Sequence, residues 1–147
     1  MAKVNRVGHV VLNVRDAEAS MKFYTEALGM EAMTFTPGRS AFLSFGKQHH
    51  DIALFQTKEE ATKGSLGLNH IAFQIEGSDD ELDVLHQHLL AKGVKVDHNR
   101  GISTDHGITH SVYFFDPDGN RLEIFCETMT PEKGMEYMRR PRVAAQR

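Results

Sequence analysis

Val7-Gly8-His9-Val10-Val11-Leu12-Asn13-Val14 is the stretch that decides the fold, because it recurs near the middle of the chain. The second copy reads Leu68-Asn69-His70-Ile71-Ala72-Phe73-Gln74-Ile75. Each copy alternates two sets of side chains along its length, which is typical of a half-buried strand. Each also carries an amide four residues after its histidine. A repeat that sets a histidine twice in the same position predicts two similar halves around one shared site.

The residues that follow the first copy predict one helix and three strands. Asp16 is suited to cap a helix, and Gly29 is suited to end it. Turn signals at Pro37-Gly38 and Gly46-Lys47 separate the predicted strands. These strands cover residues 31–36, 41–45 and 51–56.

The second half repeats this order. Ser78 and Glu81 form a capping-box pattern for a helix that runs through Lys92 and stops at Gly93. The predicted strands cover residues 94–97, 110–116 and 121–126, with a tight turn at 117–119. The order is therefore β-α-β-β-β, twice.

One such unit is too small to close a core, but two side by side can do so. We predict an α+β fold in which two β-α-β-β-β modules form a curved, cup-like mixed sheet with helices outside. The predicted domain covers residues 4–127, with module one at 4–57 and module two at 67–127. Residues 130–147 form a charged C-terminal tail with at most a short helix.

Composition narrows the classes of partner. The chain has 147 residues and a net charge of −3, so no basic field favours nucleic acid. Its apolar runs are far shorter than a bilayer span, so we expect no membrane partner. Cys126 is the single cysteine, which excludes an intrachain disulfide and favours a reducing cytoplasm.

Three side chains are candidates for metal ligands. Alternation places His9 and His70 on the less apolar faces of their strands, and Glu123 on the less apolar face of the last strand. Two histidines and one carboxylate form a facial triad, the donor set of non-haem iron(II) enzymes that leaves positions open for substrate and dioxygen. Each residue also has an ordinary alternative role as a solvated or hydrogen-bonded side chain, and periodicity alone does not decide between the two.

Two motifs resemble the signatures of the vicinal oxygen chelate superfamily. They are Ser20-Met21-Lys22-Phe23-Tyr24 with Leu28-Gly29-Met30, and Asp116-Pro117-Asp118-Gly119-Asn120-Arg121-Leu122-Glu123. This superfamily includes glyoxalase I, bleomycin-resistance proteins, fosfomycin-resistance transferases and extradiol ring-cleaving dioxygenases. The resemblance covers nearly the whole chain and implies paired β-α-β-β-β modules. It also implies that the metal ligands are His9, His70 and Glu123.

Within the superfamily, one metal-ligand position distinguishes the isomerases from the other enzymes. Its glyoxalase-like isomerases usually take a fourth ligand from the last strand of the first module. Matching residues 51–55 to residues 121–125 sets Ala53 opposite Glu123, and Ala53 cannot bind metal. A three-ligand site favours oxygen chemistry over isomerisation.

Three further residues resemble those of extradiol dioxygenases. His50-Asp51-Ile52-Ala53-Leu54 and His106-Gly107-Ile108 are similar to two of their motifs, and Tyr113 lies where they carry a tyrosine. The resemblance implies that His50, His106 and Tyr113 are catalytic. Strict alternation, however, puts His49 rather than His50 on the face of Ala53, so which of the two faces the site stays open. The segment from His106 to Tyr113 is also about two residues shorter than in the family pattern.

The expected function is extradiol cleavage of a small aromatic diol with O₂ and Fe(II), with Mn(II) as the alternative metal. We expect a homodimer or higher homo-oligomer, in which the modules pair within one chain or between chains. The rivals are a metal-dependent thiol transferase, a glyoxalase-like enzyme and a non-enzymatic drug-binding module. Val11 counts against the transferase, because fosfomycin-resistance proteins usually carry a hydroxyl residue at that position.

Overall fold

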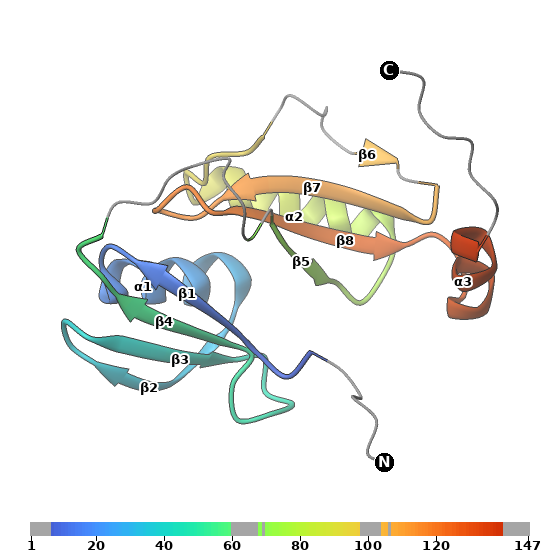
Figure 1. Ribbon diagram of the computed structural model, residues 1–147. Coiled ribbons are helices and arrows are strands. Elements are labelled where there is room, and N and C mark those ends of the chain that lie inside the picture. The colour runs from blue at the N-terminus through green and yellow to red at the C-terminus, as the bar shows by residue number, and fades with distance from the viewer. Residues whose placement is uncertain (1–6, 60–67, 69, 98–103, 106, 140–147) are drawn as a thin grey trace, which may run out of the picture.

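Within the residues that the computed structural model describes, 7–59, 68, 70–97, 104–105 and 107–139, each half of the chain folds into four strands and one helix (Figure 1). The first half contains β1 (Val10–Val14), α1 (Ala17–Leu28), β2 (Glu31–Thr36), β3 (Ser40–Ser44) and β4 (Ile52–Gln56). The second half contains β5 (Ile71–Gln74), α2 (Asp79–Ala91), β6 (Thr104–Asp105), β7 (Thr109–Phe115) and β8 (Arg121–Glu127). A third helix, α3 (Pro131–Arg139), follows.

The two halves have the same topology. Their strand orders are β1-β4-β3-β2 and β5-β8-β7-β6. In each sheet the first strand pairs in parallel with the last strand, and the other pairs are antiparallel. The predicted α+β fold with a repeated β-α-β-β-β order is therefore confirmed.

One predicted strand differs from the structure. Residues 94–97 form only an isolated bridge, between Val96 and Phe114. The two residues of β6 pair further along β7, with Ser111 and His110. Residues 94–97 and β6 therefore both lie along the edge of β7, where the sequence predicts a single strand at residues 94–97.

Local capping groups set where α1 and α2 begin, as the sequence predicts. The carboxylate of Asp16 accepts hydrogen bonds from the backbone N–H groups of Glu18 and Ala19, both at 3.0 Å. Gly29 then ends α1 in the left-handed conformation, with φ of 69°. At α2, Glu81 Oε2 accepts from the backbone N–H of Ser78 at 2.7 Å, completing the capping box.

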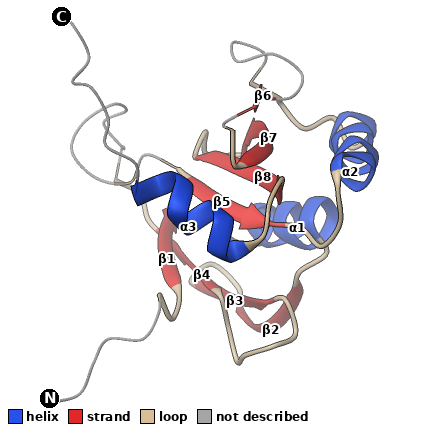
Figure 2. Cartoon of the chain, turned by 90° about the vertical axis from the view of Figure 1, so that its right-hand side faces the viewer, coloured by secondary structure: helices blue, strands red, loops and turns tan. Residues whose placement is uncertain are grey.

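The apolar faces of the two sheets line a common core. The buried cluster includes Leu12 and Leu54 from the first sheet and Phe114 and Leu122 from the second. In both Figure 1 and Figure 2, α1 lies between the sheets. Because alternate side chains of a strand point to opposite faces, the less apolar face of each sheet is turned away from this core.

The turn between β7 and β8 is bonded to α1. The buried hydroxyl of Tyr24 donates to Asp116 Oδ2 at 3.0 Å, and Ser20 Oγ donates to Asp118 Oδ2 at 3.3 Å. Asp116 also accepts hydrogen bonds from the backbone N–H groups of Asp118 and Asn120 and from the amide of Asn120. Burial first, and then the Asp116 carboxylate, raise the pKa of Tyr24 far above its ordinary value, so the phenol stays protonated. The contact fixes the second module against the helix of the first.

Candidate active site

His70 and Glu123 lie side by side on the outward face of the second sheet. Glu123 on β8 is in register with Ala72 on β5, and His70 precedes β5 by one residue. The Nε2 atom of His70 is 3.0 Å from Glu123 Oε2, and the Glu123 residue is only 6% exposed. The structure therefore brings together two of the three predicted ligands.

The other oxygen of Glu123 is held by Ser111. The Ser111 hydroxyl donates to Glu123 Oε1 at 2.5 Å, and both residues are buried. Ser111 was not among the residues predicted from the sequence. It lies two residues before Tyr113 on β7, so strand alternation places both on the face of Glu123 and could have identified it.

Tyr113 forms the wall beside this pair. It is 5% exposed and stands in register with Glu123. Its ring meets the His70 ring nearly edge-on, with centroids 5.7 Å apart. The guanidinium carbon of Arg121 lies 4.1 Å from the centre of the Tyr113 ring, and Arg121 Nε donates to Asp97 at 3.3 Å. A cation stacked on the ring fixes its orientation.

His9 belongs to a second histidine group, on the first module. The His9 and His50 rings have centroids 4.5 Å apart, and Phe42 meets His50 edge-on at 5.2 Å. His49 is exposed and its Nδ1 lies 2.5 Å from His50 Nδ1. Residues 46–51 precede β4 and form a loop rather than a strand, so alternation does not apply there. His50 is therefore the residue that lies between His9 and Phe42.

The surroundings of His50 favour its neutral form. The pKa of its imidazole is lowered from the ordinary value, first by partial loss of hydration and then by the neighbouring imidazoles of His9 and His49. A neutral imidazole can accept a proton from a bound ligand. His50 thus has the protonation state that a base requires near neutral pH.

Ala53 occupies the position in the first module that Glu123 occupies in the second. Val11 pairs with Ala53 in the parallel β1–β4 register, as Ala72 pairs with Glu123 in the β5–β8 register. His9 precedes Val11 by two residues, just as His70 precedes Ala72. Of the four equivalent positions in the two modules, three therefore carry a potential ligand and the fourth carries Ala53.

The structure does not join His9 to His70 and Glu123. Among the described residues, the one group of three such side chains whose ligand atoms all lie within 4.8 Å of one another is Asp79, His110 and Cys126. The outward direction of both polar sheet faces explains the separation within one chain. The facial triad stays a prediction, and His106 lies outside the described residues.

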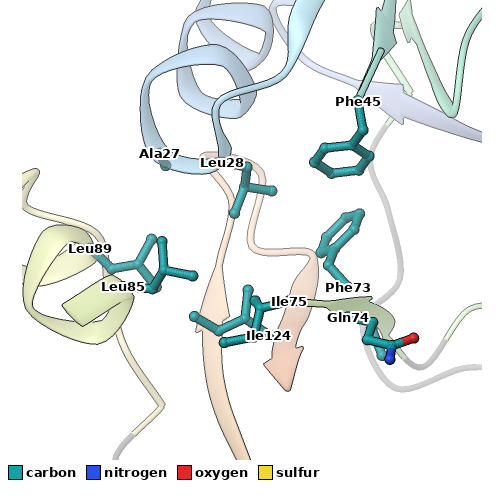
Figure 3. Close-up of a pocket in the computed structure, with 10 residues that line it drawn as sticks. Ala27, Leu28, Phe45, Phe73, Gln74, Ile75, Leu85, Leu89 and Ile124 are labelled. Carbon is teal, nitrogen blue, oxygen red and sulfur yellow. The ribbon is translucent and has the colours of Figure 1, made fainter. Parts of the chain in front are cut away.

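A cavity of about 370 Å³ lies elsewhere, between α1, α2 and β5 (Figure 3). Phe45 and Phe73 lie next to each other at one side of it, in edge-to-face contact with ring centroids 5.7 Å apart. Ile124 lines it from β8 and lies on the opposite face of that strand from Glu123. Its lining is mostly apolar, so it offers space but few groups for chemistry.

In the described part of the chain, no helix has the length and apolar character that crossing a membrane requires.

Comparisons with known proteins agree with the repeated fold. Residues 6–124 match the model of the glyoxalase/bleomycin resistance protein/dioxygenase superfamily. The chain is 32% identical over 143 residues to a biphenyl-2,3-diol 1,2-dioxygenase of Rhodococcus globerulus, covering 94% of this chain and 72% of the relative. It is 30% identical over 135 residues to an iron-dependent extradiol dioxygenase of Rhodococcus jostii, covering 82% of this chain and 43% of that protein.

A solved structure supports the fold. The glyoxylase/bleomycin resistance protein/dioxygenase domain from Frankia sp. EAN1pec superposes with a TM-score of 0.70 at 24% identity, covering 90% of this chain and 99% of that one. Because the superfamily model spans most of the chain, this protein belongs to the glyoxalase/bleomycin resistance protein/dioxygenase superfamily.

Proposed function

We propose that the protein is an extradiol dioxygenase that cleaves a small catechol-type aromatic diol with O₂. The observation that carries the proposal is the broken symmetry between the modules: His70 lies beside a buried Glu123 in one, whereas Ala53 stands at the position equivalent to Glu123 in the other. Three ligands leave more coordination positions open than four do. The names of the two Rhodococcus relatives support the same reaction class.

The proposed metal ligands are His9, His70 and Glu123. Imidazole and carboxylate donors suit Fe(II), and Mn(II) shares these preferences. The residues present fit such an ion, because Ser111 already orients the Glu123 carboxylate with its second oxygen turned toward His70. A bound Fe(II) would supply open positions at which the diol and dioxygen are held and activated.

The remaining residues handle the substrate and its protons. His50 accepts a proton from one diol hydroxyl and later returns it to the cleaved product. Tyr113 and His106 hydrogen-bond the substrate oxygens and stabilise developing negative charge. Phe42 and Phe55, whose ring centroids are 5.8 Å apart, give the first sheet an aromatic surface on which a diol ring can stack.

A second copy of the chain would complete the triad. The faces that carry His9 and Glu123 both point away from the core of their own chain, so two copies in a homodimer can bring one of each together. β1 and β5 are the edge strands from which the sheets would extend, and Val11 on β1 is 49% exposed. Each of the two sites would then be shared between copies.

The activity test is anaerobic reconstitution with Fe(II), followed by catechol or 2,3-dihydroxybiphenyl and O₂. We expect oxygen uptake and a yellow ring-cleavage product from the wild-type chain and neither from Glu123→Ala. No colour and no oxygen uptake across a panel of such diols would overturn the proposal. Full iron content in His9→Ala, His70→Ala and Glu123→Ala alike would overturn the ligand assignment.

Mixing two inactive variants tests the shared site. If His9 and Glu123 come from different copies, refolding His9→Ala together with His70→Ala forms some heterodimers with one intact site, and activity returns. If the modules close a cup within one chain, each variant keeps its own defect and the mixture stays inactive.

A further inference from the structure

A second group of metal-binding side chains lies at the start of α2. Asp79 is the first residue of that helix, while His110 and Cys126 are register partners on β7 and β8. His110 Nδ1 contacts Asp79 Oδ1, and Cys126 Sγ donates to the same oxygen at 3.5 Å. One potential ligand atom from each residue lies within 4.8 Å of the other two.

This group is separate from the candidate active site. Cys126 follows Glu123 by three residues on β8, and His110 adjoins Ser111 on β7, so both point to the opposite face of the sheet. Cys126 belongs to the buried core with Leu122 and Ile124. The same two strands thus present potential ligands on both of their faces.

The donor chemistry differs from that of the facial triad. A thiolate, an imidazole and a carboxylate are a donor set typical of Zn²⁺, and the thiolate disfavours the hard ions that prefer oxygen alone. Zinc bonds of about 2.0–2.3 Å in a tetrahedron set donors roughly 3.3–3.8 Å apart. Cys126 Sγ already lies 3.5 Å from Asp79 Oδ1, within that spacing. Asp79 Oδ1 and His110 Nδ1, now in hydrogen-bond contact, would move slightly apart to let the ion between them.

The burial of the three side chains suits an ion that arrives from solvent. Cys126 is 1% exposed, whereas the side chains of His110 and Asp79 are 27% and 60% exposed. Asp79 and His110 thus form the open side, and Cys126 the closed side. Three protein ligands leave the fourth tetrahedral position to water.

We propose that Asp79, His110 and Cys126 form a second metal site, which takes Zn²⁺ or another thiophilic divalent ion. The Cys126 S–H bond breaks as the sulfur–metal bond forms, and the proton leaves to solvent. The His110 Nδ1 proton moves to Nε2, so that Nδ1 can donate its electron pair. The ion would join the start of α2 to β7 and β8, which predicts a rise in Tm when metal is bound.

Cobalt(II) provides the direct test, because Cys126 is the only cysteine of the chain. A near-ultraviolet thiolate-to-Co(II) charge-transfer band can therefore come from this site alone, whatever binds at the facial triad. We expect about one equivalent of Co²⁺ to develop the band, Zn²⁺ to abolish it, and Cys126→Ser to lack it.

Asp79→Asn and His110→Ala should weaken metal binding at this site about tenfold or more, as followed by the thiolate band, and should make the Zn²⁺-dependent rise in Tm smaller than that of wild type. Asp80→Asn, which alters the exposed neighbouring carboxylate, is the matched control and should behave as wild type. The absence of a thiolate band in the wild-type chain would overturn the proposal. So would a Cys126→Ser variant whose Zn²⁺-dependent rise in Tm equals that of wild type, or an Asp80→Asn variant whose rise is as small as that of Asp79→Asn.

Discussion

Ser111→Ala should weaken the binding of Fe(II) without removing any of its proposed ligands. The Ser111 hydroxyl donates to Glu123 Oε1 at 2.5 Å in a buried setting, where water cannot readily replace it. The substitution removes only the Oγ atom and leaves a small gap on an interior strand. Glu123 then keeps its contact with His70 but loses the bond that fixes the plane of its carboxylate.

The size of the effect follows from the charge and burial of the acceptor. A hydrogen bond to a charged group contributes about 1.5–3 kcal/mol, and each 1.4 kcal/mol changes an equilibrium constant about tenfold. If that orientation is needed for metal binding, Fe(II) affinity should fall about 10- to 100-fold. The ring-cleavage rate at saturating Fe(II) should fall much less, because the ligand set is unchanged.

Anaerobic competition with a chromogenic Fe(II) chelator measures this affinity. Ser20→Ala is the matched control, because it also removes a hydrogen bond from a buried serine to a carboxylate, but on α1, away from Glu123. Ser111→Thr, which keeps the hydroxyl, should recover part of the loss. An Fe(II) affinity of Ser111→Ala equal to that of wild type would refute the reasoning, as would an equal loss in Ser20→Ala.

Substitutions at three further positions test other parts of the structure. Tyr24→Phe should lower the free energy of unfolding in urea by about 1.5–3 kcal/mol, since it removes a buried bond to Asp116; an unchanged urea midpoint would count against this contact. His50→Phe should retain its iron and lower turnover about 10²- to 10⁴-fold; an unchanged rate would move the acid–base role to His49 or His106. Asp16→Ala should cost about 1 kcal/mol in thermal unfolding, and Asp16→Ser much less, because serine also caps helices. Equal losses in the two Asp16 variants would show that capping is not the cause.

Local signals explain how much of the fold could be predicted. Strand alternation and helix capping are properties of neighbouring residues, so Asp16, Gly29 and the Ser78–Glu81 box could be read directly. β6 could not be predicted, because a strand of two residues is too short to show alternation of side chains. Residues 94–97 carry a strand-like run, but sharing an edge with β6 limits them to one bridge.

In the candidate site, too, local patterns predict some residues, whereas others depend on how distant segments pack. Alternation and the repeat put His70 and Glu123 on matching faces, and the β5–β8 register then brings them together. Alternation failed between His49 and His50, because the chain there forms a loop. Asp79, His110 and Cys126 come together because the start of α2 packs close to β7 and β8. The spacing of these residues in the sequence does not reveal that distance in space.

The buried turn carboxylate of Asp116 has a consequence for mutational surveys of this chain. It lies in one of the two motifs that resemble the superfamily's signatures. If the proposed dioxygenase activity is assayed, the loss of Asp116 would be recorded as lost turnover. Yet its partners are a helix of the other module and the turn of its own hairpin. Changing Asp116 would remove a hydrogen bond that holds the second module against the helix of the first. Any site built from residues of both modules would then be misaligned. An activity assay alone would therefore classify Asp116 as catalytic, although it holds the two modules together. Measuring the stability of the same variant distinguishes the structural role from a catalytic one.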